Sequence, residues 1–181
     1  MQDDRRMSLK PALAPPAVGI SRCLLGESVR YDGGHRHQPA LVAALSQHFH
    51  LVAICPETEA GLGVPRPAVQ LVQQSDEIRA CGVADAELDV STALVDCAVR
   101  HRAQLEGLHG FVFKARSPSC GVGSTPLHGE QGEVVGSTSG LFAARVQAWL
   151  PRLPLAEETQ LVDAAACEDF IARVWAYYRG E

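Results

Sequence analysis

The sequence predicts an α/β fold: a mostly parallel sheet flanked by helices, in a Rossmann-like, three-layer, single-domain arrangement. Apolar runs of strand length alternate along the chain with segments whose apolar residues recur at helical spacing. This alternation is typical of parallel sheets built from strand–helix–strand units. The chain has 181 residues, of which 46% are hydrophobic and 20% charged, and this is enough for one domain with its own core.

Each expected element follows from a local pattern. Apolar runs predict a buried strand that runs into a loop at residues 18–25, further core strands at 49–54 and 111–115, and a short strand at 69–72. Helical spacing predicts helices at 39–48, 89–106, 141–149 and 168–178. Prolines and glycines predict a loop at 61–67, and the glycine-rich stretch 121–139 is expected to be loop-like as well.

The chain divides into three expected segments. Residues 1–16 are a flexible N-terminal tail that ends in a proline- and alanine-rich run, 17–150 form the α/β domain, and 151–181 form a C-terminal helical extension. The first ten residues are charged and polar and lack the apolar stretch of a secretory signal. No segment has the run of about 20 apolar residues that spans a bilayer, so we expect no membrane contact and a soluble, cytoplasmic protein.

The formal net charge is −5. Broad nucleic-acid binding requires a strongly basic surface, so this balance argues against a nucleic-acid partner and favours a small-molecule substrate. The sequence does not indicate an oligomeric state.

Three of the six cysteines occupy related positions. Cys23, Cys55 and Cys120 each lie at or just beyond the carboxyl end of an expected core strand, where open α/β sheets bind ligands. We therefore expect these three side chains to meet in one crevice. The remaining cysteines are expected to be structural; they are Cys81, Cys97 and Cys167.

Converging thiolates suit zinc, copper(I) or an iron–sulfur cluster. Three ligands leave one coordination position open, and an open position allows a metal site to do chemistry. The residues alone leave several interpretations: cysteines buried together without a metal, a zinc-dependent hydrolase, an iron–sulfur carrier or redox sensor, or a regulatory module that binds a thiolated metabolite.

Polar residues surround the three cysteines. Glu57 follows Cys55 by two positions, and Ser117 and Ser119 flank Cys120 together with the positive charges of Lys114 and Arg116. Carboxylates and hydroxyls at such a site can move protons or bind a substrate.

Two further residues are candidates for substrate contacts. Asp32 lies in the loop after the first cysteine, and Arg66 lies between two prolines near the second. The competing interpretations are a structural turn for Asp32 and a salt bridge for Arg66.

Three motifs resemble the thiouracil desulfidase (TudS) family, which was formerly a domain of unknown function. The first is CLLG at 23–26, followed by RYDGGH at 30–35; the second is CPE at 55–57, followed by PRP at 65–67; the third is KARSPSCG at 114–121. The resemblance covers roughly residues 17–150, with the motifs in the family's order.

The resemblance implies an α/β enzyme whose [4Fe-4S] cluster is held by Cys23, Cys55 and Cys120. It implies a non-redox desulfidation of a 2-thiouracil-like thiocarbonyl compound, in which oxygen replaces sulfur and sulfide is released. Glu57 and Ser117 match the family's acid and first serine, and we expect these two residues to be catalytic. Ser119, Asp32 and Arg66 are expected to bind the substrate.

Overall fold

A parallel sheet forms the centre of the molecule. The computed structural model describes residues 14–181, so most of the expected tail at 1–16 lies outside the described part. The sheet has the strand order β2-β1-β5-β8, and every neighbouring pair is parallel. Its strands are β1 (Ala17–Ser21), β2 (His50–Ile54), β5 (Gly110–Phe113) and β8 (Leu155–Glu157). The predicted α/β class with a mostly parallel sheet is confirmed.

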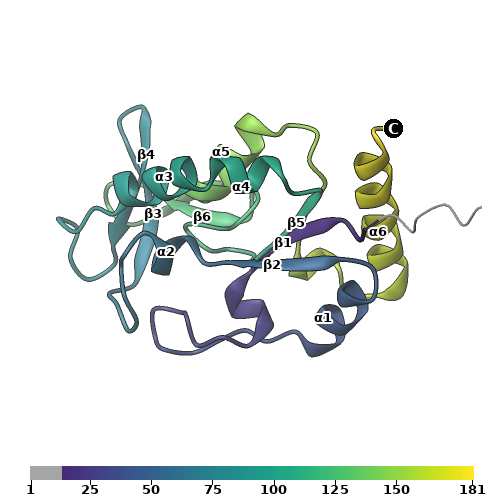
Figure 1. Ribbon diagram of the computed structural model, residues 1–181. Helices are drawn as coiled ribbons and strands as arrows, with labels where there is room; N and C mark the ends of the chain where they lie inside the picture. The colour runs from purple at the N-terminus through teal and green to yellow at the C-terminus, as the bar shows by residue number, and fades with distance from the viewer. Residues whose placement is uncertain (1–13) are drawn as a thin grey trace, which may run out of the picture.

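Helices cover both faces of this sheet, which gives the expected three layers (Figure 1). The helices α1 (Pro39–Ser46) and α6 (Ala164–Arg179) pack on one face. The other face is covered by α3 (Ser91–Arg100), α4 (Arg102–Glu106) and α5 (Leu141–Trp149).

The side chains of β5 divide between the two helical layers. Successive residues of a strand point to opposite faces of its sheet. Val112 therefore packs with α1 and α6, whereas Phe111 and Phe113 stack on each other, with ring centroids 3.9 Å apart, under the helices of the other layer. This division makes β5 apolar on both sides, as its sequence pattern indicated.

A second four-stranded sheet was not predicted. Its order is β4-β3-β6-β7. Its strands are β3 (Val69–Gln74), β4 (Glu77–Gly82), β6 (Thr125–His128) and β7 (Val134–Thr138). The expectation of a loop throughout 121–139 is wrong, because β6 pairs with β3 in parallel and β7 pairs back onto β6. Most residues of β7 are exposed, so no apolar alternation marks it in the sequence.

The expected long helix at 89–106 is two helices. The first begins at Ser91, because the Asp89 side chain accepts the Ser91 N–H at 2.8 Å in a turn. The helices separate at His101, whose backbone has φ −88° and ψ 0°. The His101 ring is hydrogen-bonded to the carbonyl oxygen of Cys97 and lies in ion-pair contact with Glu59. These contacts lie at the break between the two helices.

The C-terminal segment joins the central sheet. The α/β domain was expected to span residues 17–150. The strand β8 follows residue 150, and its Leu155 pairs with Phe111 of β5. Among the described residues, no helix combines the length and the apolar character needed to cross a bilayer.

Candidate functional site

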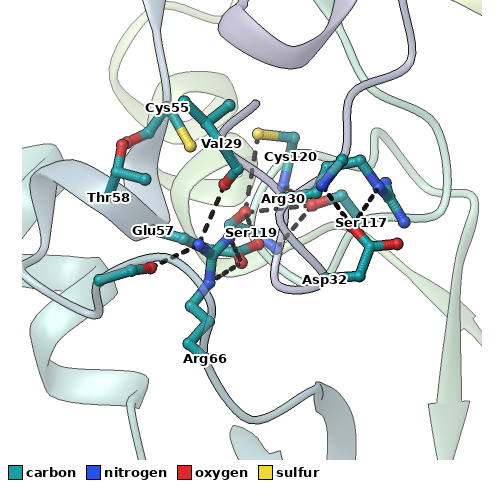
Figure 2. A network of polar contacts seen from close by, with 12 residues as sticks. Val29, Arg30, Asp32, Cys55, Glu57, Thr58, Arg66, Ser117, Ser119 and Cys120 are labelled. Atoms are coloured by element: carbon teal, nitrogen blue, oxygen red, sulfur yellow. Dashed lines mark hydrogen bonds and ion pairs between the residues drawn. The ribbon is translucent and has the colours of Figure 1, made fainter. Parts of the chain in front are cut away.

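Three neighbouring strands bring the three cysteines to one edge of the sheet. β1 leads into the 3₁₀ helix η1 (Arg22–Leu25), which contains Cys23, and β2 leads into the one-turn helix α2 (Pro56–Glu59), whose N-cap is Cys55. Cys120 lies in the loop after β5. Because β2, β1 and β5 are adjacent, the three segments lie side by side, and all three cysteines line a cavity of about 450 Å³. Figure 2 shows the side chains of Cys55 and Cys120 directed toward the same space.

Two of the three thiols in this cavity are buried. Cys23 is 8% exposed and Cys120 is 5% exposed, and neither forms a disulfide. Burial, with a contribution from the neighbouring Cys55, raises the pKa of the Cys23 thiol to about 11. Burial also raises the pKa of Cys120, although a hydrogen bond from the Ser21 hydroxyl opposes the shift. Near neutral pH these two thiols are therefore protonated unless a bound cation stabilises the thiolate form.

The lining of the cavity is rich in positive charge. Its cationic side chains are Arg22, Arg30, Arg36, Arg66, Lys114 and Arg116. Of these, Arg30 and Lys114 lower the pKa of Cys23 and so oppose the effect of burial. This electrostatic environment favours an anionic group, such as a set of metal-bound thiolates.

Glu57 is held in place by an arginine and a serine (Figure 2). The guanidinium of Arg66 donates to Glu57 Oε2 through Nε at 2.9 Å and through a second nitrogen at 2.5 Å. The hydroxyl of Ser119 donates to Glu57 Oε1 at 2.8 Å. The side chains of Glu57 and Arg66 are only 12% and 5% exposed, so this is a buried, oriented carboxylate at the cavity wall.

Arg66 has little donor capacity left for another molecule. Besides the two bonds to Glu57, its remaining terminal nitrogen donates to the carbonyl oxygens of Val29 at 3.0 Å and Gly63 at 2.8 Å. Arg66 lines the cavity, but its contacts are those of a residue that orients Glu57.

The hydroxyls of Ser117 and Ser119 form a directed chain. Ser117 Oγ accepts the N–H groups of Ser119 at 3.3 Å and Cys120 at 3.2 Å. The two hydroxyl oxygens are 3.1 Å apart, and Ser119 donates to Glu57, so Ser117 donates to Ser119. The chain Ser117–Ser119–Glu57 thus links the Cys120 loop to the carboxylate.

Asp32 is the one expected site residue that does not line the cavity. Its exposed carboxylate accepts the N–H of Gly34 at 2.9 Å, which closes a turn, and this bond lowers the pKa of Asp32. The other expected residues line the cavity together; they are Cys23, Cys55, Glu57, Arg66, Ser117, Ser119 and Cys120.

The first turn of α5 fixes the backbone of the Cys120 loop. The carbonyl oxygen of Ser119 accepts the N–H groups of Phe142 at 3.1 Å and Ala143 at 3.0 Å. Gly140 permits this close approach, because a Cβ atom there would lie 2.5 Å from the carbonyl carbon of Ser119. A residue with a side chain at position 140 would push the loop away from the helix.

A buried carboxylate from the C-terminal segment also holds this loop. Glu158, in the 3₁₀ helix η2 (Glu158–Gln160), accepts the N–H of Ala115 at 2.6 Å and pairs with Lys114 Nζ. The side chains of Glu158 and Lys114 are 6% and 13% exposed. A residue outside the three motifs therefore supports the segment that carries Cys120.

Replacing Glu158 with alanine should destabilise the fold by about 3–5 kcal/mol, because it leaves the Lys114 charge buried without a partner. Denaturant unfolding measures the loss. Glu168→Ala, at an exposed position of α6, is the control and should change stability by less than about 0.5 kcal/mol. Equal stabilities of the two variants would contradict the supporting role of Glu158.

Cys97 gives the fold a pH dependence above pH 9. It is fully buried, and burial together with the nearby Glu59 charge raises its pKa from 9.0 to about 11. Between these values the unfolded chain releases a proton that the folded chain keeps, so stability should fall as the pH rises from 9 to 11. Denaturant unfolding at several pH values should show a smaller fall for Cys97→Ala than for the parent, and parallel curves would contradict this assignment.

Sequence reasoning did not single out Glu59 or Arg22. Glu59 Oε1 accepts the N–H of Cys55 at 3.0 Å and a bond from the Arg22 guanidinium at 2.9 Å. The available signals were that Arg22 precedes Cys23 and that Glu59 follows Cys55 by one helical turn.

Two comparisons with known proteins found matches to this chain. The family model described as 2-thiouracil desulfurase matches residues 18–158. A solved structure described as the [4Fe-4S]-dependent thiouracil desulfidase TudS is 28% identical, with a TM-score of 0.63. The match covers 85% of this chain and 98% of that chain. A search of curated proteins returned no match.

Proposed function

The chain belongs to the 2-thiouracil desulfurase family, and from this premise we propose that it uses a [4Fe-4S] cluster to desulfurise a 2-thiouracil-like compound. The similar solved structure is described as a [4Fe-4S]-dependent thiouracil desulfidase, which supports this cofactor and substrate class. The proposed reaction is non-redox: a thiocarbonyl and one water give a carbonyl and hydrogen sulfide, with no net gain or loss of electrons. The observation that carries the proposal is the meeting of Cys23, Cys55 and Cys120 in the cavity that Glu57 also lines.

The residues of the cavity fit this cofactor. Thiolate sulfur is the usual protein ligand of iron–sulfur clusters. Here three cysteines line the same cavity, and none of them forms a disulfide. The surrounding cations offset the negative charge of three thiolates, which burial alone would disfavour. We assign Cys23, Cys55 and Cys120 as the ligands of the cluster.

With three protein ligands, a bound cluster supplies an iron with an open position, which is a Lewis acid with affinity for sulfur. The residues of this chain then have to bind the heterocycle, deliver water and move protons. A cavity of about 450 Å³ is within the range that holds small organic ligands.

Glu57 is the proposed general base. Oε2 accepts two hydrogen bonds from Arg66, whereas Oε1 accepts one from Ser119 and keeps a lone pair that can take a proton from water. The water oxygen forms a bond to the thiocarbonyl carbon, and the carbon–sulfur bond breaks. The proton taken by Glu57 passes to the departing sulfur, so the carboxylate is regenerated. The second proton leaves the new hydroxyl group as the carbonyl forms and also passes to the sulfur, which departs as hydrogen sulfide.

Ser117 and Ser119 are proposed to assist this proton movement. Their hydroxyls are already hydrogen-bonded in the direction of Glu57 Oε1. Ser117 is further fixed by two backbone N–H groups, which hold the first hydroxyl of this chain in a defined position.

Turnover of 2-thiouracil in ¹⁸O-labelled water tests the proposal. The protein is reconstituted anaerobically with iron and sulfide and assayed without a reductant. We expect uracil and sulfide in equal amounts, with ¹⁸O in the new carbonyl group. A requirement for added electrons, or no sulfide from a protein with a full cluster, would contradict the proposed reaction.

A further inference from the structure

A second carboxylate on α2 contacts the segments of two proposed ligands. Glu59 lies two residues after Glu57, so the two side chains point to nearly opposite sides of the helix, about 160° apart. Glu59 Oε1 accepts the N–H of Cys55 at 3.0 Å and a guanidinium hydrogen of Arg22 at 2.9 Å. Arg22 immediately precedes Cys23 in η1. One oxygen atom therefore bridges the Cys55 backbone and the segment of Cys23.

The other oxygen of Glu59 is anchored on helix α3. Glu59 Oε2 lies 2.5 Å from Nε2 of His101. Nδ1 of the same ring lies 2.9 Å from the carbonyl oxygen of Cys97, which fixes the ring orientation. The carboxylate is 20% exposed and engaged at both oxygens, so it has a single well-defined position between α2, η1 and α3.

These contacts favour an anchor over a second metal site. Ligand-type atoms of Glu59, Cys97 and His101 lie within 4.8 Å of one another, as around a divalent metal. However, a guanidinium nitrogen of Arg22 lies 2.9 Å from Glu59 Oε1 in an ion pair. A positive charge at that distance from the carboxylate opposes the binding of a metal cation. The arrangement is that of a hydrogen-bonded support for the cysteine segments.

We propose that Glu59 is a positioning residue of the cluster site. Its bonds tie the backbone of Cys55 to the segment that carries Cys23. Its negative charge offsets that of Arg22, which lines the cavity, so the carboxylate keeps the reduction potential of the cluster lower than the unpaired arginine would. A low potential keeps the cluster in one oxidation state, as a non-redox reaction needs; the inference rests on the proposed function.

Glu59→Gln and Glu59→Ala separate the hydrogen bond from the charge. The glutamine keeps an acceptor oxygen for the Cys55 N–H, whereas the alanine removes it. Glu27→Gln is the matched control, because Glu27 also pairs with Arg22, at 3.5 Å, but its side chain is 50% exposed and has no bond to Cys55. Each protein is reconstituted anaerobically, then challenged with an iron chelator and titrated electrochemically.

We expect Glu59→Gln to keep its iron but to show a reduction potential above that of the parent. Glu59→Ala should lose iron to the chelator about 10- to 100-fold faster, the usual effect of removing a support of a metal ligand. Glu27→Gln should match the parent in both measurements.

Two different results would contradict the proposed role of Glu59. A parent that holds a cluster, with glutamine and alanine variants equal to it in potential and iron retention, would overturn the role of Glu59 alone. A parent that takes up no iron would overturn the proposed function and this inference together. If the alanine variant fails to fold, the potential of the glutamine variant still decides the claim.

Discussion

Replacing Cys120 by alanine should abolish both cluster binding and sulfide release. Cys120 comes from the loop after the central strand β5, and its loss leaves two thiols that cannot hold a cluster with a single open iron. Removing a group that merely supports a ligand costs about 10- to 100-fold, so loss of the ligand itself should exceed about 100-fold in kcat/KM. Iron content and sulfide release from 2-thiouracil measure the two effects.

Cys81→Ala is the control for this substitution. Cys81 is 3% exposed, which matches the 5% exposure of Cys120, but it lies in β4 of the second sheet. It should change neither iron content nor turnover. A Cys120→Ala protein with the full iron content of the parent would remove Cys120 from the ligand set.

Replacing Glu57 by glutamine should leave the cluster in place and lower the turnover rate by about 100- to 10 000-fold. This is the usual contribution of a positioned general base, and an amide cannot accept the proton. Glutamine has the same shape, and its oxygen can still accept one bond from Arg66 or Ser119. The rate of sulfide release per cluster is the measurement.

The stability of Glu57→Gln has to be followed in parallel. The substitution leaves the buried Arg66 charge without its carboxylate partner, which costs about 3–5 kcal/mol. A thermal unfolding curve together with the iron content separates this cost from the loss of the base. Turnover close to the parent's in a folded, iron-loaded variant would contradict the role of Glu57.

Three of the four strands of the central sheet were predictable from the sequence, whereas β8, which has three residues including Glu157, was not predicted. β1, β2 and β5 are short apolar runs, and each is followed at its carboxyl end by a segment with a cysteine. Parallel strands place those ends at the same edge, so the meeting of Cys23, Cys55 and Cys120 in one cavity follows from local patterns and topology.

The second sheet depends on pairing between distant segments. Leu71 in β3 pairs with Leu127 in β6, and β7 has no buried face to mark it as a strand. Such strands form because they pair with neighbouring strands, and their own residues give little sequence signal. A glycine-rich stretch with short polar strands is therefore predicted to be a loop.

The polar contacts of the site were only partly predictable. The motifs indicated Glu57, Ser117 and Arg66 individually, but not that Arg66 and Ser119 would both bind the carboxylate. The anchoring residues Glu59 and Glu158 are common surface residue types, and only the folded chain shows that they reach the backbone of the cysteine segments.

Mössbauer spectroscopy of the protein reconstituted anaerobically with ⁵⁷Fe tests the central claim most directly. We predict about four irons per chain, one of which has distinct parameters because it lacks a cysteine ligand. The signal of that iron should change when 2-thiouracil is added. A protein that instead binds one zinc ion tightly, or a cluster in which 2-thiouracil alters no iron signal, would contradict a three-cysteine cluster with an iron open to substrate.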